Sequence, residues 1–299
     1  MTLVKLGLKG ALVCFAFGVC FGVGGALAGV ARLLASDSRL QSADAGMLLP
    51  YSLFCVTVGT VISCLVLRSG SSGIRLALVL FVATYAISTV APQVDSLFFL
   101  SAKLPPGMIR ALFEQGAIAM ALFTAIAMAI LGKWRSATAT VRQPEPPIGV
   151  RGMTWRLVLL VLIFVFLYML FGYFVAWRNP ALRAYYGGTD YANFYEALKS
   201  NWQREPLLFC LQAFRAVLYV ACLYPLLRTL FVPRWGNAIA ASAFLASWTT
   251  PLLLPNPLMP TSVARSHFWE TLGFTLVFGA LMGWLTARRA EASAITDAP

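Results

Sequence analysis

A series of long apolar segments constrains this chain more than any other feature. Eight segments of about 18 to 21 residues contain very few charged side chains: residues 10–30, 47–67, 74–91, 111–131, 157–177, 207–227, 237–254 and 268–286. A bilayer core about 30 Å thick needs roughly 20 apolar residues in a helix. The segments lack the period-two alternation of barrel strands. The sequence therefore predicts an all-α, polytopic transmembrane helix bundle of about eight spans.

The composition agrees with this prediction and excludes other classes. The chain has 299 residues, of which 60% are hydrophobic and 11% are charged, whereas about 25% are charged in an ordinary soluble domain. Too few charged side chains are present to cover two soluble domains, although the length would allow two. The chain is also far too apolar to be disordered.

The basic residues predict both termini on the cytoplasmic side of the cell's inner or plasma membrane. With the N-terminus inside, thirteen of the 23 lysines and arginines fall on the inner side, nine on the outer side, and Arg215 within a span. Such an excess marks cytoplasmic loops. Most acidic residues, including Asp95, fall outside or at the outer boundary. Because the net charge of +12 is spread over short loops, it does not indicate nucleic-acid binding.

The first span allows an alternative reading of the N-terminus. It ends in the residues Ala26, Leu27 and Ala28, which resemble a signal-peptide cleavage site. Cleavage there would leave seven spans and place the new N-terminus outside.

A central segment rich in proline and basic residues, 132–156, predicts a cytoplasmic linker. It separates a first half, residues 1–131, from a second half, residues 157–287, and residues 288–299 form a cytoplasmic tail. Each half contains four predicted spans, so both would have the same orientation. This organisation is consistent with two parallel four-helix repeats related by an axis along the membrane normal.

The starts of the fourth and eighth spans support the repeat and supply binding candidates. Each start has a proline, then an arginine, then a glutamate: Arg110 with Glu114, and Arg265 with Glu270. We expect both glutamates to point inward beneath an outer vestibule, with the arginines offsetting their burial. The alternative is that these are ordinary helix starts, where proline and an acidic residue are both favoured.

The outer loop, residues 178–206, is unusually rich in aromatic side chains. Phe194, Leu198 and Trp202 recur every four residues, which is typical of an amphipathic helix on the membrane surface. The loop is either a lid over a cavity or an interfacial anchor.

Arg215 is the most informative single residue. It is the ninth of 21 residues in the sixth span, where a charged guanidinium is costly without a partner or water. Gln212 and Tyr219 lie on the same helix face. A guanidinium suits a carboxylate or phosphate, so these residues could bind a small anionic or amphipathic molecule or a lipid head group. The alternatives are an internal ion pair and hydrogen bonds to carbonyls of a broken helix.

The glycines of the first span, Gly18, Gly22, Gly25 and Gly29, lie on one helix face and predict close helix packing. We expect this contact within the chain. A membrane protein partner or a second copy is the alternative.

No metal site, cofactor or catalytic signature is predicted. His267 and Glu270 have a spacing found in metal-binding helices, but the chain has one histidine and no further ligand is apparent. The six cysteines fall inside predicted spans and are interpreted as apolar residues. Nucleotide-binding and metalloprotease motifs are also missing from the sequence.

Three functions remain open. The first is transport or binding of a small anionic or amphipathic molecule through Arg215. The second is a non-catalytic role as a membrane partner or assembly subunit. The third is an enzyme acting on lipid-linked substrates at the outer face, which would require His267, Glu114 and Glu270 to meet.

Overall fold

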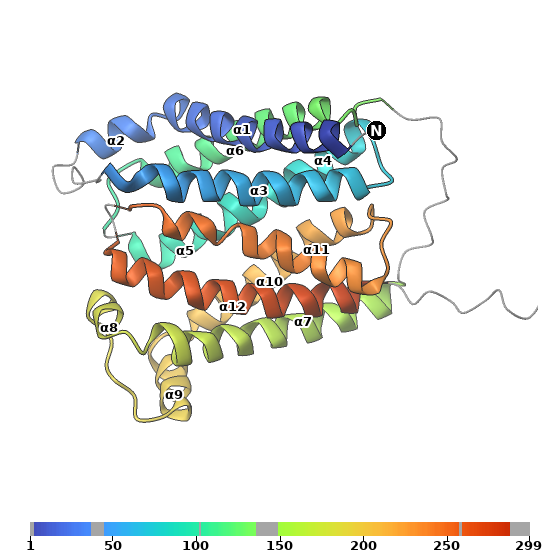
Figure 1. Cartoon of the computed structure of the whole chain (residues 1–299). Coiled ribbons are helices and arrows are strands. Elements are labelled where there is room, and N and C mark those ends of the chain that lie inside the picture. Colours follow the sequence, from blue (N-terminus) through green and yellow to red (C-terminus); the bar gives the residue numbers. More distant parts are fainter. Residues whose placement is uncertain (1–2, 37–44, 102, 136–148, 257–258, 288–299) are drawn as a thin grey trace, which may run out of the picture.

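The computed structural model describes residues 3–36, 45–101, 103–135, 149–256 and 259–287 as a bundle of helices. Seven helical segments are long and apolar enough to cross a membrane, and they run side by side in Figure 1. The chain is therefore a multi-pass α-helical membrane protein. The seven segments are α1 (Leu3–Leu27), α3 (Leu48–Arg68), α4–η3–α5 (Gly73–Leu100), α6 (Met108–Ile130), α7–η4 (Val150–Ala176), α10 (Leu207–Leu227) and α12 (Thr261–Thr286).

Apolar side chains both fill the bundle and cover it. Each spanning segment buries only 28% to 50% of its most apolar window. The rest of that apolar surface faces outward, as lipid requires of a membrane protein. Inside, fully buried aromatic rings form the core between helices of both halves, among them Phe17, Phe54, Phe164 and Phe278.

The predicted span 237–254 forms a short helix and a turn. Helix α11 (Arg234–Ser247) has 14 residues, which rise about 21 Å and fall short of a bilayer core. The chain then makes the 3₁₀ turn η5 (Thr250–Leu253), which contains Pro251. In Figure 1, α11 and the segment after it together run along the bundle beside α12. The seventh predicted span is thus a short helix followed by a turn, and not one continuous membrane-length helix.

Two spans contain a five-residue π-helical segment. Segment η3 (Ala86–Val90) joins α4 (Gly73–Tyr85) to α5 (Ala91–Leu100), and η4 (Gly172–Ala176) extends α7 (Val150–Phe171). Pro92 explains the first, because it has no N–H to donate to the carbonyl of Ser88. Segments of this kind occur frequently at functional sites.

The helix contacts follow the same scheme in both halves. In the first half α1 packs on α3 and α6, and α4 packs on α6. In the second half α7 packs on α10 and α12, and α11 packs on α12. Between the halves, α3 meets α11 and α4 meets α10. Two four-span repeats about a two-fold axis would make these contacts, and the repeat remains a prediction for superposition to test.

The two ends of the bundle differ. The start of α1, the end of α6, the start of α7 and the end of α12 share one end, here called the terminal end (Figure 1). Helices α8 (Pro180–Tyr186) and α9 (Phe194–Arg204) lie at the other, the α8 end. Helix α9 runs across the direction of the long helices, as a helix lying on a membrane surface would. The short helix α2 (Val30–Ser36) also lies at the α8 end.

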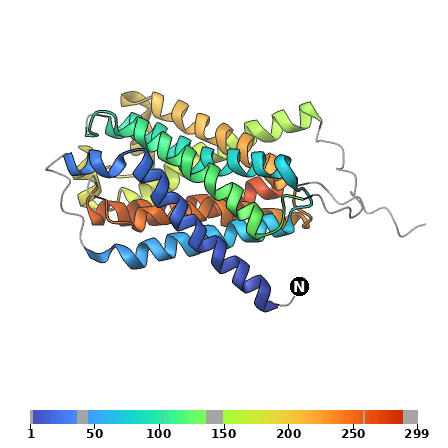
Figure 2. The ribbon, with the colours of Figure 1, turned by 90° about the horizontal axis from the view of Figure 1, so that it is seen from above.

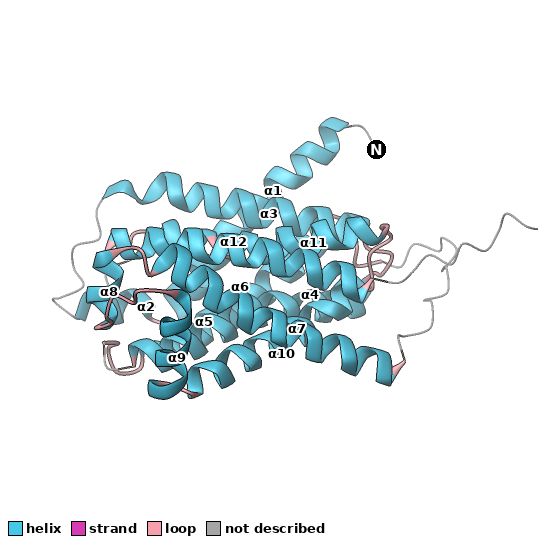
Figure 3. Ribbon diagram, turned by 90° about the horizontal axis from the view of Figure 1, so that it is seen from below, coloured by secondary structure: helices cyan, strands magenta, loops and turns pink. Residues whose placement is uncertain are grey.

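Helix α1 crosses its neighbours obliquely, and its first turns leave the bundle (Figures 2 and 3). A Cβ at Gly18 would lie 3.0 Å from the Cys55 Sγ of α3, and one at Gly25 would lie 3.2 Å from the Gln115 Nε2 of α6. Positions 22 and 29 have no such neighbour within 4 Å. Two of the four predicted glycines therefore pack within the chain, and a partner protein remains a prediction.

Candidate functional site

Arg215 forms an ion pair in the middle of the bundle. Arg215 is 8% exposed, and its Nη1 lies 3.1 Å from Oδ2 of Asp95 on α5. Asp95 belongs to the first half of the chain and Arg215 to the second. Of the readings left open by the sequence, the internal ion pair is the one observed. The pair therefore links the two halves. Breaking it would leave an uncompensated charge inside the bundle.

The neighbours of Arg215 on α10 contribute further contacts. Nη1 donates to Oε1 of Gln212 at 2.9 Å, and Nη2 lies 3.5 Å from the hydroxyl of Tyr219. The guanidinium carbon also lies 5.7 Å from the centre of the Phe164 ring of α7, within the range of a cation–π interaction. Residues three and four apart share a face of a helix, which is why Gln212 and Tyr219 reach Arg215.

Three polar atoms at this pair are covered but have no hydrogen-bond partner within the described part of the chain: Arg215 Nε, Gln212 Nε2 and Asp95 Oδ1. Buried polar atoms are nearly always hydrogen-bonded, so each one that is not calls for an explanation. Two of the three atoms are N–H donors and one is a carboxylate acceptor. The described residues thus leave two hydrogen-bond donors and one acceptor unused at this pair.

A second set of polar side chains, from α12 and α8, lies towards the α8 end. Glu270 is 8% exposed, and its Oε2 lies 2.8 Å from Nδ1 of His267. The other ring nitrogen of His267, Nε2, lies 3.1 Å from the hydroxyl of Tyr186. The expected partner of Glu270 was an arginine. Arg265 is instead exposed, and His267 occupies the partner's place.

Electrostatic interactions connect the two groups. Asp95 interacts with Glu270 and His267 as well as with Arg215. Tyr168 of α7 interacts with Asp95, Glu270 and Arg215. We call the set the charge cluster; its members are Asp95, Tyr168, Tyr186, Gln212, Arg215, Tyr219, His267 and Glu270.

Both π-helical segments adjoin the charge cluster. Asp95 lies one turn beyond Pro92 in α5, the helix that begins directly after η3. Glu270 packs against η4, where a Cβ at Gly172 would lie 3.4 Å from Oε1 of Glu270. The irregular backbone therefore occurs beside the partly buried carboxylate of Asp95 and the buried carboxylate of Glu270.

The remaining candidates, Arg110 and Glu114, are placed elsewhere. They form an ion pair of 2.7 Å along α6, with side chains that are 85% and 45% exposed. They line a hollow of about 300 Å³ between α6 and the junction of α1 and α2, together with Gly29 and Arg32. Glu270 points inward as expected, whereas Glu114 is half exposed.

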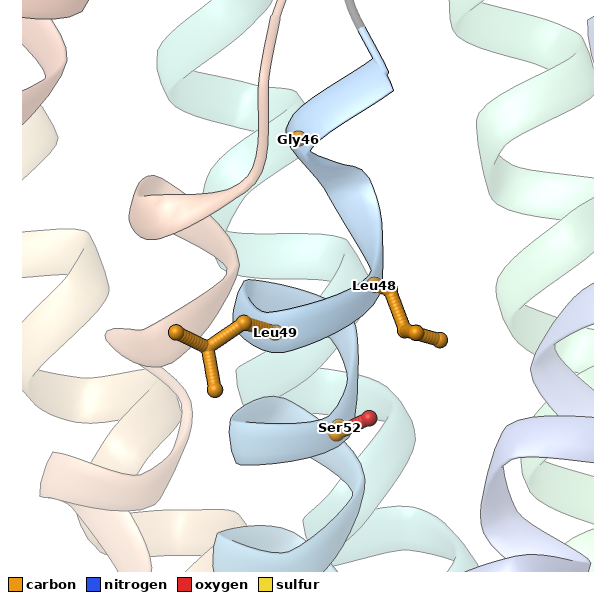
Figure 4. A pocket seen from close by; sticks show the side chains of 4 residues that line it. All are labelled: Gly46, Leu48, Leu49 and Ser52. Carbon is orange, nitrogen blue, oxygen red and sulfur yellow. The ribbon is translucent and has the colours of Figure 1, made fainter.

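Another hollow, of about 410 Å³, lies at the start of α3, and Figure 4 shows the side chains that line it. Gly46, Leu48, Leu49 and Ser52 line it. Leu48 and Leu49 are both largely exposed and point to opposite sides of the helix (Figure 4). A surface lined by such residues suits lipid chains, and it presents no charged group to a polar ligand.

Asp95 is the residue that sequence reasoning missed. Its position at the end of an apolar run suggested the outer boundary of the membrane. In the structure that run continues as a helix through η3 and Pro92 to Leu100, which carries Asp95 into the bundle. The available signal was the need of Arg215 for a buried partner.

A scan against protein-family models, a search of curated proteins and a search of solved structures found no match to this chain.

Proposed function

We propose that this protein transports a small anionic or amphipathic molecule that binds at Arg215, together with a proton that binds at Asp95. The observation that carries the proposal is the Asp95–Arg215 ion pair, with its unpartnered atoms, at the contact between the two halves. In transporters built from repeats, substrate and coupling ions bind near the middle of the membrane at the repeat interface.

Protonation of Asp95 would release Arg215 from its charged partner. Nη1 and Nε of Arg215 and Nε2 of Gln212 would then be available to an acceptor such as a carboxylate or a phosphate. The proton and the anion together add no net charge to the cluster. Loading the site with both would therefore avoid the cost of adding an uncompensated charge at this depth.

The placement of the protein belongs to the same proposal. Both termini would lie on the cytoplasmic side of the inner or plasma membrane, so the α8 end would face outward. The excess of basic residues at the terminal end supports this orientation. The aromatic helix α9 would then lie on the outer leaflet.

The geometry favours transport over an acid–base enzyme. The enzyme hypothesis required His267 and both glutamates in one place. Glu270 meets His267, whereas Glu114 lines the hollow beside α1 and α2. The partner-protein hypothesis has no comparable buried charge to support it.

Reconstituted vesicles test the proposal. The purified chain is placed in vesicles that contain the pH dye pyranine, and phosphate, sulfate, succinate or a short alkyl sulfonate is added outside under an inward proton gradient. We expect at least one anion to accelerate internal acidification several-fold over protein-free vesicles. We expect Arg215→Gln and Asp95→Asn to abolish that acceleration, and Arg110→Gln to retain it. Equal rates with and without protein for all four anions would contradict the proposal.

A further inference from the structure

Tyr186, His267 and Glu270 form a chain of hydrogen bonds that leads from the α8 end into the charge cluster. The Tyr186 hydroxyl lies 3.1 Å from Nε2 of His267, and Nδ1 of His267 lies 2.8 Å from Oε2 of Glu270. His267 is the one histidine in the sequence. Neutral imidazole can accept a proton on one nitrogen and release one from the other.

Helix α8 is fixed in the position that this chain requires. The side chain of Asn179, which caps α8, donates to the backbone oxygen of Ser262 at 3.0 Å and to the hydroxyl of Ser266 at 2.8 Å. Both partners lie in the first turns of α12. Leu182 and Val263 are buried against each other beside them. Tyr186 therefore remains next to His267.

The two hydrogen-bond partners of His267 favour one position for its ring proton, because the Glu270 carboxylate can only accept from Nδ1 whereas the Tyr186 hydroxyl can donate to Nε2. Burial raises the pKa of Tyr186 well above its usual range, and the neighbouring Tyr185 and the carboxylates raise it further. Tyr186 thus keeps its proton and can donate it to Nε2 of neutral His267. The ring proton then resides on Nδ1, facing Glu270.

We propose that Tyr186, His267 and Glu270 form the proton entry of the charge cluster. A proton from the α8 end binds to Nε2 of His267, and the proton on Nδ1 passes to Oε2 of Glu270. The ring returns to its neutral state with its proton on Nε2, and the Tyr186 hydroxyl turns to accept from it. One proton has entered, and the Glu270 carboxylate has become a carboxylic acid.

The surroundings of His267 suit this role. Titratable and charged groups of four other elements lie near the chain of hydrogen bonds: Asp95 from α5, Tyr168 from α7, Arg215 from α10 and Lys103 from the segment before α6. Asp95 and Tyr168 both interact electrostatically with Glu270. A proton that reaches Glu270 has therefore reached the neighbourhood of Asp95. The inference rests on the proposed function, in which Asp95 takes up the transported proton.

Nitrogen NMR of His267 tests the geometry without any substrate. Because the chain has one histidine, ¹⁵N-histidine labelling with an affinity tag that lacks histidine gives one pair of side-chain signals. In nanodiscs, at a pH where the ring is neutral, we expect Nδ1 to be protonated and Nε2 unprotonated. Tyr186→Phe should shift the population towards the Nε2-protonated form. A wild-type ring protonated on Nε2 would overturn the proposal.

The vesicle assay tests the transfer itself. With an anion that accelerates acidification, His267→Gln, Glu270→Gln and Tyr186→Phe should each slow proton uptake at least threefold. Tyr224→Phe removes a tyrosine hydroxyl near the other end of α10 and should leave the rate unchanged. Wild-type rates in His267→Gln would reject the proton entry while leaving transport intact. If no anion acts on the wild type, transport is rejected, and the NMR result alone decides the hydrogen-bond chain.

Discussion

At the residue scale, the ion pair of Asp95 and Arg215 explains how a guanidinium is tolerated in the middle of the bundle. Each charge is the principal partner of the other, at 3.1 Å. Replacing one partner leaves the other charge buried and unpaired, which typically costs about 3–5 kcal/mol. Replacing both by neutral residues removes that penalty.

A double-mutant cycle measures this coupling. We expect Asp95→Asn alone to destabilise the protein strongly and Asp95→Asn with Arg215→Gln to recover much of the loss, with a coupling energy of about 2 kcal/mol or more. Unfolding by sodium dodecyl sulfate in mixed micelles supplies the free energies. Arg110→Gln and Glu114→Gln form the matched control, because that pair is exposed, and its coupling should be close to zero. Similar coupling in the two cycles would show that the buried pair has no special role.

Some contacts of Arg215 and Glu270 could be predicted from the sequence, and others could not. The spacing of Gln212, Arg215 and Tyr219 is local, so their common face was predictable. The pairing of Arg215 with Asp95 spans 120 positions and depends on how α5 meets α10, which helix periodicity does not determine. The pairing of Glu270 with His267 is local, yet the exposed Arg265 was the expected partner because an arginine can offset the partial burial of a carboxylate.

At the element scale, close packing of α11 on α12 compensates for the shortness of α11. A Cβ at Gly279 would lie 2.6 Å from the Cα of Ser242, and one at Gly283 would meet the backbone of Asn237. These two glycines are four residues apart, the spacing that lets transmembrane helices approach closely. The short helix α11 is held in the bundle largely through this contact.

Substitution of these glycines tests the contact. Gly279→Ala places a methyl group against backbone atoms that have no room to move, and overpacking of this kind costs about 1–3 kcal/mol. We expect the melting temperature in detergent to fall by several degrees. Gly22→Ala, where nothing lies within 4 Å, should leave it unchanged. An unchanged melting temperature for Gly279→Ala would mean that α11 is not packed as described.

The spans could be predicted from the sequence because a membrane helix needs only sufficient length and an apolar composition. Seven of the eight predicted segments are long apolar helices. The exception, 237–254, matches the others in length and apolar character. Its helix α11 has already ended before Trp248 and Thr249, and the turn that contains Pro251 follows them. The π-helical segments gave no such signal, since only one of the two precedes a proline.

At the scale of the whole molecule, the two halves meet at the terminal end through the loops that follow α3 and α10. Gly70, after α3, donates to the backbone oxygen of Thr229, after α10, at 2.8 Å, and Phe231 donates to that of Arg68 at 3.1 Å. Lys133 Nζ adds a bond of 2.7 Å to the oxygen of Ser69. These contacts tie the loops after α3, α6 and α10 together at the terminal end.

The orientation of the molecule is tested by reporter fusions in a bacterial host. The ends of α6 and α12 lie at the terminal end together with the start of α1. A reporter that fluoresces only in the cytoplasm, fused after position 142 or after position 289, should be active in both cases. A phosphatase that works only outside should be inactive at both positions. Activity of the phosphatase at either position would reverse the proposed orientation.

The central claim is that Arg215 with Asp95 forms a binding site for a small anion and a proton. The most direct test is the melting temperature of the purified protein with phosphate, sulfate, succinate or an alkyl sulfonate, at pH 5.5 and at pH 7.5, since a ligand that binds only the folded state stabilises it. We predict that at least one anion raises the melting temperature of the wild type, more at pH 5.5 than at pH 7.5, and that none does so in Arg215→Gln. The absence of any shift in the wild type, or an equal shift in Arg215→Gln, would contradict the claim.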